Sequence, residues 1–248
     1  MAKVIATANH KGGVGKTTTA VSLGAALSRQ GQRVLLVDMD AQANLTRCLN
    51  VTASKGNLYD ALKGNAPAQP VRVYDNLDVL AGTRDLSAAD IELANEVGRE
   101  YLLQGVLKPL QGKYDVIILD TPPSLGLLTI NAFTAANGVI IPLQAEVLAL
   151  HGLTDLLAIF NKVKQRLNKS LEIYAAVVTR YDNRKVLNRQ VLESVRGHFG
   201  NGTLTAVIRE NVAIAEAPAT STDIFVYAPK SAGAKDYAEL ATALLERL

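Results

Sequence analysis

The stretch NHKGGVGKTTTA, residues 9–20, decides the fold because it joins an apolar strand to a helix through a glycine-rich loop. Gly12, Gly13 and Gly15 let the backbone curl so that successive N–H groups point inward at an anion. The helix that follows presents its positive end to the same place. His10 stands where the pattern G-x-x-x-x-G-K-[ST] has its first glycine, but the other positions match. A glycine-rich loop alone can be a tight turn, whereas one between a strand and a helix predicts a nucleotide-phosphate site.

The loop contains two lysines where one would suffice. Lys16 is predicted to contact the β- and γ-phosphates, and the Thr17 hydroxyl is predicted to bind magnesium. Lys11 has no space among these groups, so it could reach a nucleotide in a neighbouring subunit and neutralise charge there. The alternative is a solvated surface lysine. The predicted nucleotide-binding residues of the loop are Lys11, Gly12, Gly13, Val14, Gly15, Lys16, Thr17 and Thr18.

Around this loop, short apolar runs alternate with longer segments of helical period. Such alternation predicts an α/β fold, a mostly parallel, twisted β-sheet flanked by helices on both faces. The runs are too apolar to leave one face in water, so the strands should be buried on both sides. The predicted strands are residues 3–9, 33–38, 77–82, 114–120, 138–143, 172–179 and 203–208. Apolar spacing predicts helices over residues 151–168 and 235–248. Because no linker or repeat interrupts the pattern, residues 1–248 are expected to form a single domain.

Carboxylates follow two of the predicted strands. Asp120 ends the apolar run VIILD, where a buried carboxylate needs a cation, so it is predicted to hold magnesium through water. Asp38 and Asp40 flank Met39 at the end of another strand, and we expect them to point to opposite sides, so that they do not both face one ligand. Helix capping is the alternative for this pair. Residues 122–124, Pro-Pro-Ser, form a stiff turn after Asp120 that is well placed to sense the γ-phosphate.

Composition limits the other classes of site. Cys48 is the one cysteine of the 248 residues, which excludes an internal disulfide and a multi-thiolate metal site, and a structural thiol is expected. His10, His151 and His198 lack the spacing of metal ligands. The sequence shows neither a leader pattern nor a membrane-spanning apolar run, so we expect a soluble, cytoplasmic protein.

The charge of the chain is unevenly distributed. Residues 160–200 contain nine basic and three acidic residues, whereas the whole chain has a net charge of only +3. A basic region on a nearly neutral protein suggests a surface that faces phosphates, and a solvated helix face is the alternative.

Several motifs in order resemble the ParA/MinD family of dimerising P-loop ATPases. KGGVGKTT (11–18) is similar to the deviant Walker A motif of this family, whose first lysine crosses the dimer interface. VLLVDMDAQANLT (34–46) and YDVIILDTPPSLGLLTINAFTAA (114–136) resemble the second-strand motif and the Walker B and switch II segment. Four later segments follow in the order seen in small, Soj-like partition ATPases: PLQAEVLALHGL (142–153), TRYDNR (179–184), NVAIAEAP (211–218) and YAPKSAGAKDYAELA (227–241).

The resemblance implies ATP and Mg²⁺ as cofactors and a homodimer that encloses two ATP molecules. It implies that Asp40 orients the attacking water and that Asp38 supports the water shell of the metal. The catalytic residues are then Lys11, Lys16 and Asp40, and the metal site consists of Thr17, Asp38 and Asp120. Arg180 and Asn211 become candidates for adenine recognition. Unstimulated hydrolysis is expected to be slow, with a ParB-like or cargo-adaptor partner accelerating it.

Three classes of function remain open: a partition ATPase on non-specific DNA, a MinD-like ATPase on membranes, and a metabolic relative such as the nitrogenase iron protein or an ATP-dependent ligase. Cys48 does not lie at the cluster positions of an iron protein. The C-terminal segment balances basic and acidic residues, so it does not look like a membrane-binding helix. The basic region therefore favours DNA binding and a location at the nucleoid.

The predicted DNA-binding residues are Arg184, Lys185, Arg189 and Lys230. Ala213 stands where Soj-like sequences have an arginine associated with DNA contact, which puts the arrangement of this surface in doubt.

Overall fold

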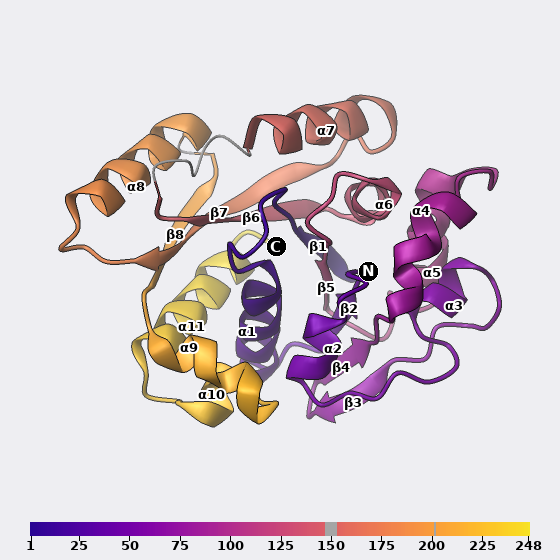
Figure 1. Cartoon of the computed structure of the whole chain (residues 1–248), viewed down its shortest axis with the longest axis horizontal. Helices are drawn as coiled ribbons and strands as arrows, with labels where there is room; N and C mark the ends of the chain where they lie inside the picture. The colour runs from indigo at the N-terminus through magenta and orange to yellow at the C-terminus, as the bar shows by residue number, and fades with distance from the viewer. Residues whose placement is uncertain (147–152, 201) are drawn as a thin grey trace.

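An eight-stranded sheet runs through the centre of the molecule (Figure 1). The computed structural model describes residues 1–146, 153–200 and 202–248. The strand order is β3-β4-β2-β5-β1-β6-β7-β8, and every neighbouring pair is parallel except β3 and β4. The strands are β1 (Lys3–Thr7), β2 (Val34–Asp38), β3 (Val71–Tyr74), β4 (Leu77–Leu80), β5 (Val116–Asp120), β6 (Gly138–Gln144), β7 (Glu172–Tyr181) and β8 (Leu204–Arg209).

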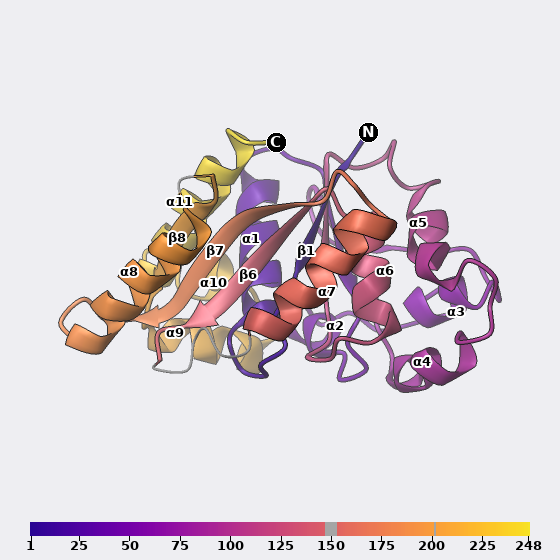
Figure 2. The same cartoon turned by 90° about the horizontal axis from the view of Figure 1, so that it is seen from above.

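Helices cover both faces of this sheet (Figures 1 and 2). The α-helices are α1 (Lys16–Arg29), α2 (Asn44–Cys48), α3 (Leu58–Leu62), α4 (Ala89–Glu92), α5 (Leu102–Leu107), α6 (Leu127–Ala135), α7 (Leu153–Arg166), α8 (Val186–Phe199), α9 (Val212–Glu216), α10 (Ile224–Tyr227) and α11 (Ala232–Leu245). Short 3₁₀ helices are η1 (Arg84–Ala88), η2 (Arg99–Tyr101) and η3 (Ala217–Thr220). In the part of the chain that is described, no helix is both long and apolar enough to cross a bilayer.

Two apolar clusters form the core, one on each face of the sheet. One packs Leu23 of α1 and Leu240 of α11 against Ile118 of β5. The other packs Phe133 of α6 and Phe160 of α7 against the opposite face. Strands β2 and β5 are buried at every residue, as their unbroken apolar sequences predict. The α/β class and the mostly parallel sheet are therefore confirmed.

The seven predicted strands are present, with ends shifted by a few residues. An eighth strand, β3, was not predicted, because its residues are half-buried or exposed and alternate Val with Arg and Tyr. It pairs antiparallel with β4 at the edge of the sheet through a register shift. Edge strands are less apolar than central ones, which weakens their signal in the sequence.

The predicted C-terminal helix begins earlier than its apolar spacing suggests. The Ser231 hydroxyl accepts a hydrogen bond from the backbone N–H of Ala234, which caps α11 at Ala232. The other predicted helix is found as α7, and its first two predicted residues, 151–152, lie outside the described residues. Leu156, Phe160 and Val163 are buried on one face of α7, as their spacing predicts.

Candidate nucleotide-binding site

The glycine-rich loop lies between β1 and α1, at the carboxyl ends of the central parallel strands. This edge is where open α/β sheets bind ligands. Gly13 has φ of 75° and Gly15 has φ of 94°, in the left-handed region that favours glycine. Gly15 is also the N-cap of α1, so the loop turns directly into the helix. The glycine loop and the N-terminus of α1 are therefore adjacent, and their backbone N–H groups can together bind a phosphate.

Two buried side chains that the sequence did not single out hold this loop in place. The Asn9 side-chain amide donates to the carbonyl of Pro142 at 2.7 Å, and its oxygen accepts from the Lys11 N–H at 2.9 Å. The Thr179 hydroxyl at the end of β7 donates to the Val14 carbonyl at 2.9 Å. Both contacts depend on strands β6 and β7, which are far away in the sequence, so the local motif could not reveal them.

Lys16 is a buried cation, with a relative exposure of 7%. Burial lowers the pKa of its ammonium group, and the negative charges of Asp120 and Asp40 oppose that shift. Its Nζ atom donates to the Lys11 carbonyl at 3.3 Å, inside the loop. A lysine in this position suits an anion held by the loop. The negative phosphate would pair with the ammonium group and offset the cost of burying its positive charge.

Lys11 points away from the loop and forms an ion pair with Glu146, at 2.8 Å between Nζ and Oε2. About half of each side chain is exposed: 42% for Lys11 and 48% for Glu146. Lys11 is therefore neither among its own phosphate-binding groups nor an unpaired surface lysine. Glu146 was not predicted, since it lies 135 residues from Lys11 in the sequence.

Asp120 is fully buried at the end of β5. Its Oδ1 atom lies 3.4 Å from the Thr7 hydroxyl, and its Oδ2 atom has no hydrogen-bond partner among the described residues. Burial and the nearby negative charge of Asp38 raise the pKa of this carboxyl to about 8. A buried carboxylate oxygen with no donor fits a divalent cation or a water molecule bound to one.

The donor set around Asp120 is small. The described residues contain no group of three or more His, Cys, Asp or Glu that could hold a metal ion. Such a set suits Mg²⁺ better than zinc, because Mg²⁺ keeps several waters and takes further ligands from nucleotide phosphates. Thr17, in the first turn of α1, lines the same large cavity as the glycine loop and could donate its hydroxyl oxygen to such an ion.

Asp38 and Asp40 have different environments, but strand alternation is not the reason, because residues two positions apart in a strand share a face. The strand β2 ends at Asp38, and Asp40 lies in the turn beyond it. Asp38 is fully buried, and its Oδ2 atom accepts hydrogen bonds from the Thr46 N–H at 2.9 Å and the Thr46 hydroxyl at 2.7 Å. Burial raises the pKa of this carboxyl, and the bonds from Thr46 oppose the shift. Asp40 is only half-buried, accepts from the Gln42 N–H at 3.0 Å and lines the large cavity. Asp40 is thus the more accessible of the two carboxylates.

A cavity of about 650 Å³ adjoins the glycine loop. It is large enough for a nucleotide-sized ligand. Arg180 and Asn211, the predicted adenine-contacting residues, both line it, although they are 31 positions apart in the sequence. Asn211 uses its side-chain oxygen to cap α9, accepting from the Ala213 N–H at 2.9 Å. Arg209 and Val212 line the cavity as well and were not predicted.

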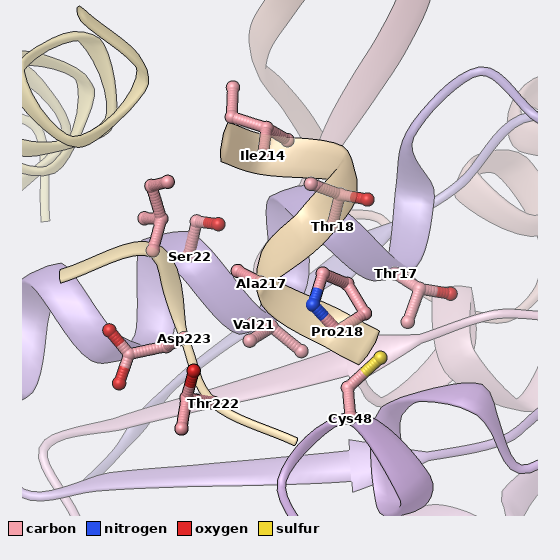
Figure 3. A pocket seen from close by; sticks show the side chains of 11 residues that line it. Thr17, Thr18, Val21, Ser22, Cys48, Ile214, Ala217, Pro218, Thr222 and Asp223 are labelled. Atoms are coloured by element: carbon pink, nitrogen blue, oxygen red, sulfur yellow. The ribbon is translucent and has the colours of Figure 1, made fainter. Parts of the chain in front are cut away.

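A second, much smaller cavity lies between the first turns of α1, the end of α2 and the segment of α9, η3 and α10 (Figure 3). Its volume is about 30 Å³, and Thr17, Thr18 and Cys48 are among its lining residues. The Cys48 side chain is half-buried, and burial raises the pKa of its thiol. A thiol that resists ionisation agrees with the expected structural role.

The four predicted DNA-binding residues lie around the carboxyl ends of β7 and β8. Arg184 forms two hydrogen bonds of 2.9 Å with Asp182, and Lys185 pairs with Glu210 at 3.0 Å. Arg189 donates to the carbonyl of Asn183 at 2.6 Å. Lys230 precedes α11, whose Asp236 binds Arg209 at the end of β8. Two of the four positive charges are therefore partly neutralised within the subunit.

Comparisons with known proteins agree with this site. The AAA domain family matches residues 2–173. The chromosome partitioning protein ParA of Caulobacter vibrioides is 44% identical over 252 residues, which cover 99% of this chain and 94% of that protein. The chromosome-partitioning ATPase Soj of Thermus thermophilus is 45% identical over 244 residues, covering 98% and 96%. The chain belongs to the ParA/Soj family of P-loop ATPases. This confirms the family that the motifs predicted.

A solved structure extends the comparison to three dimensions. The crystal structure of cobyrinic acid a,c-diamide synthase from Mycobacterium smegmatis with bound ADP and magnesium is 40% identical to this ParA/Soj family member. Its TM-score is 0.87, and the alignment covers 100% of this chain and 95% of that one. The fold described above is therefore shared with a relative whose structure contains ADP and magnesium.

Proposed function

We propose that the protein is a ParA-type ATPase whose Mg·ATP-bound form is a homodimer on non-specific DNA. A partner, either ParB-like or a cargo adaptor, stimulates hydrolysis and releases the dimer, so that the cycle drives partition of a chromosome or plasmid or positions a cargo over the nucleoid. The observation that carries this proposal is the position of Lys11: it is half-exposed, pairs with Glu146, and does not line the nucleotide cavity that Gly12 to Thr18 line. A cation there is available to a second subunit.

Within one subunit, each proposed nucleotide ligand has a distinct position. The backbone of residues 12–15 and the ammonium of Lys16 bind the phosphates. Thr17 and Asp120 hold Mg²⁺, and Asp38 supports the water shell of the metal. The metal, when bound, offsets the charge that develops on the transferred phosphoryl group. Asp40 holds a water molecule in line with the γ-phosphate, and Asp38 keeps α2 in place through Thr46. Lys11 from the second subunit completes the charge around the γ-phosphate.

Light scattering tests the dimer directly. The mass should double with ATP or a slowly hydrolysed analogue plus Mg²⁺, and it should stay that of one subunit with ADP. A single mass under all three conditions would reject the sandwich dimer and leave Lys11 without its proposed role.

Glu146→Gln should strengthen ATP-driven dimerisation, because Lys11 no longer has to leave an ion pair before it crosses the interface. An exposed pair contributes up to about 1 kcal/mol, and a dimer breaks two, so the dimer Kd should fall by a few-fold, with about thirtyfold as the upper limit. Sedimentation with the slowly hydrolysed analogue measures this constant. A weaker dimer would show instead that Glu146 itself contributes to the interface.

Charge reversal at Arg184 and Arg189 should weaken binding to every duplex DNA sequence equally while leaving ATP-driven dimerisation intact. The loss follows from electrostatics, since each phosphate contact removed should lower the salt slope by about one. The measurement is fluorescence anisotropy with two unrelated duplexes over a range of salt concentrations. Lys108→Glu, near α5 at the other end of the sheet, is the matched control and should keep the wild-type slope.

The ion pairs of the free subunit refine this expectation. Arg189 and Lys230 have no carboxylate partner among the described residues, whereas Asp182 and Glu210 compensate Arg184 and Lys185. Single alanine substitutions at Arg189 and Lys230 should therefore cost more DNA affinity than those at Arg184 and Lys185.

Two other results would move the protein to another functional class. Binding of the dimer to anionic liposomes but not DNA indicates a MinD-like ATPase, and hydrolysis that requires cobyrinic acid indicates a ligase.

A further inference from the structure

The first half of α11 contacts two sides of the nucleotide cavity. The loop side consists of residues 12–18, and the far side consists of residues 208–212, 214 and 215. α11 packs along α1, which begins in the loop side, and against β8, which ends in the far side (Figures 1 and 2). Gly233 and Tyr237 are four positions apart, so they lie on one face of α11. The contacts of this segment decide how far apart the two sides lie.

Tyr237 connects α11 to the loop side. Its side chain is buried, with a relative exposure of 1%, and it lines the nucleotide cavity. Its hydroxyl is hydrogen-bonded to the hydroxyl of Thr19 at 3.3 Å. Thr19 is fully buried, and its N–H donates to the Gly15 carbonyl at 2.8 Å, which closes the first turn of α1. That turn carries Lys16 and Thr17, so Tyr237 anchors the turn that presents the predicted phosphate and magnesium ligands.

Asp236 and Gly233 connect the same helix to the far side. The buried Asp236 carboxylate accepts hydrogen bonds from the Arg209 N–H at 2.8 Å and from Arg209 Nε at 3.0 Å. A Cβ atom at Gly233 would lie 2.6 Å from Ile214 Cδ1, so α11 approaches α9 more closely than a residue with a side chain allows. Arg209 and Ile214 both line the cavity, on either side of Asn211 in the sequence.

These contacts join both sides of the cavity to one helix of 14 residues. A ligand that touches both sides binds more tightly when their spacing is already fixed, because binding then does not have to order the second side. A ligand that touches the loop side alone gains nothing from that spacing. ADP belongs to the first class if its base lies against Asn211, as predicted, whereas inorganic tripolyphosphate belongs to the second.

We propose that Tyr237, Asp236 and Gly233 are positioning residues that hold the two sides of the cavity at the spacing of a nucleotide, so that the site prefers a nucleotide to a bare polyphosphate. The proposal rests on the nucleotide site of the proposed function and on the predicted position of the base. It does not depend on the dimer, on DNA or on a partner protein.

Tyr237→Phe tests the contact with the loop side, because it removes one hydroxyl and keeps the ring. We expect the Kd of Mg·ADP to rise about threefold to tenfold, as the loss of one buried hydrogen bond allows. The Kd of Mg·tripolyphosphate should stay unchanged, and calorimetry measures both. Thr19→Val should have the same effect as Tyr237→Phe, and the double variant should be no weaker than either single one, since both remove the same bond.

Tyr114→Phe is the matched control. Tyr114 is buried as well, and its hydroxyl donates to Asp78 at 2.7 Å, but it precedes β5 and so lies at the edge of the sheet opposite the nucleotide site. Both variants should lose similar thermal stability, whereas Tyr237→Phe alone should weaken ADP binding. Three results would overturn the role of Tyr237: an unchanged ADP Kd, equal weakening of ADP and tripolyphosphate, or the same weakening of ADP in Tyr114→Phe.

Gly233→Ala tests the contact with the far side. The added methyl group raises helix propensity, so α11 should remain folded, but it displaces Ile214 toward the cavity. We expect the ADP Kd to rise about tenfold and the tripolyphosphate Kd to stay unchanged. Gly197→Ala is the matched control: it lies in α8, where a Cβ atom meets nothing within 4 Å, and it should keep the wild-type values. An unchanged ADP Kd in Gly233→Ala would reject the far-side contact.

The outcomes for this inference and for the proposed function are separate. ADP binding is measured on single subunits, so a protein that never dimerises with ATP refutes the proposed dimer while the ADP and tripolyphosphate affinities still decide the role of α11. Conversely, normal ATP-driven dimerisation together with unchanged ADP affinities in Tyr237→Phe and Gly233→Ala would overturn this inference alone.

Discussion

Lys11→Ala should bind ATP with nearly the affinity of the wild-type protein, form no dimer and hydrolyse ATP at least about 10³ times more slowly, which is the range of a charge supplied in trans. The reason is geometric. Lys11 contacts Glu146 and does not line the nucleotide cavity of its own subunit, so its removal takes no ligand from ATP bound there. The measurements are ATP binding by fluorescent-nucleotide titration, mass by light scattering, and phosphate release.

Lys16→Ala is the matched control for this prediction. Both substitutions remove one lysine from the same loop, but Lys16 is buried and its ammonium group lies inside the loop. Loss of a buried cation that faces the phosphates should abolish ATP binding itself. A Lys11→Ala protein that also fails to bind ATP would show that Lys11 acts within its own subunit, contrary to the proposed dimer.

The central part of the fold could be predicted because local sequence determines it. β2 and β5 are buried along their whole length, so they read as unbroken apolar runs, and the left-handed Gly13 and Gly15 mark the loop between β1 and α1. β3 escaped prediction because it is an edge strand whose side chains are half in water. Its antiparallel pairing depends on β4 and a register shift, neither of which has a signal in VRVY alone.

The supporting residues of the site could not be predicted for a different reason. Thr179 reaches Val14 across 165 residues of sequence, and Glu146 reaches Lys11 across 135. No pattern within a strand or loop indicates such contacts, because they exist only once β1, β6 and β7 lie side by side. The different environments of Asp38 and Asp40 could not be predicted from strand alternation, since residues two apart in a strand share a face; they differ because β2 ends at Asp38 and Asp40 lies in the following turn. Their catalytic roles, like those of Lys11 and Lys16, stay predictions.

Asp40→Ala should trap the ATP-bound dimer, with turnover reduced about 10² to 10⁴ times and a correspondingly longer dimer lifetime. Among the three carboxylates near the loop, Asp120 is fully buried, and its Oδ2 has no partner in the described part of the chain. Asp38 accepts two hydrogen bonds from Thr46. Asp40 alone of these three is half-exposed and lines the nucleotide cavity, so it can hold a water molecule without holding the metal.

The substitution should therefore leave the phosphate and magnesium ligands in place while removing the group that aims the water. Single-turnover hydrolysis and the rate of dimer dissociation after dilution measure the two effects. Asp38→Ala is the contrasting variant: it removes the acceptor of both Thr46 bonds, and it should lower thermal stability and ATP affinity together. If Asp40→Ala lost ATP binding instead, Asp40 would belong to the metal site, and the attacking water would need another residue to orient it.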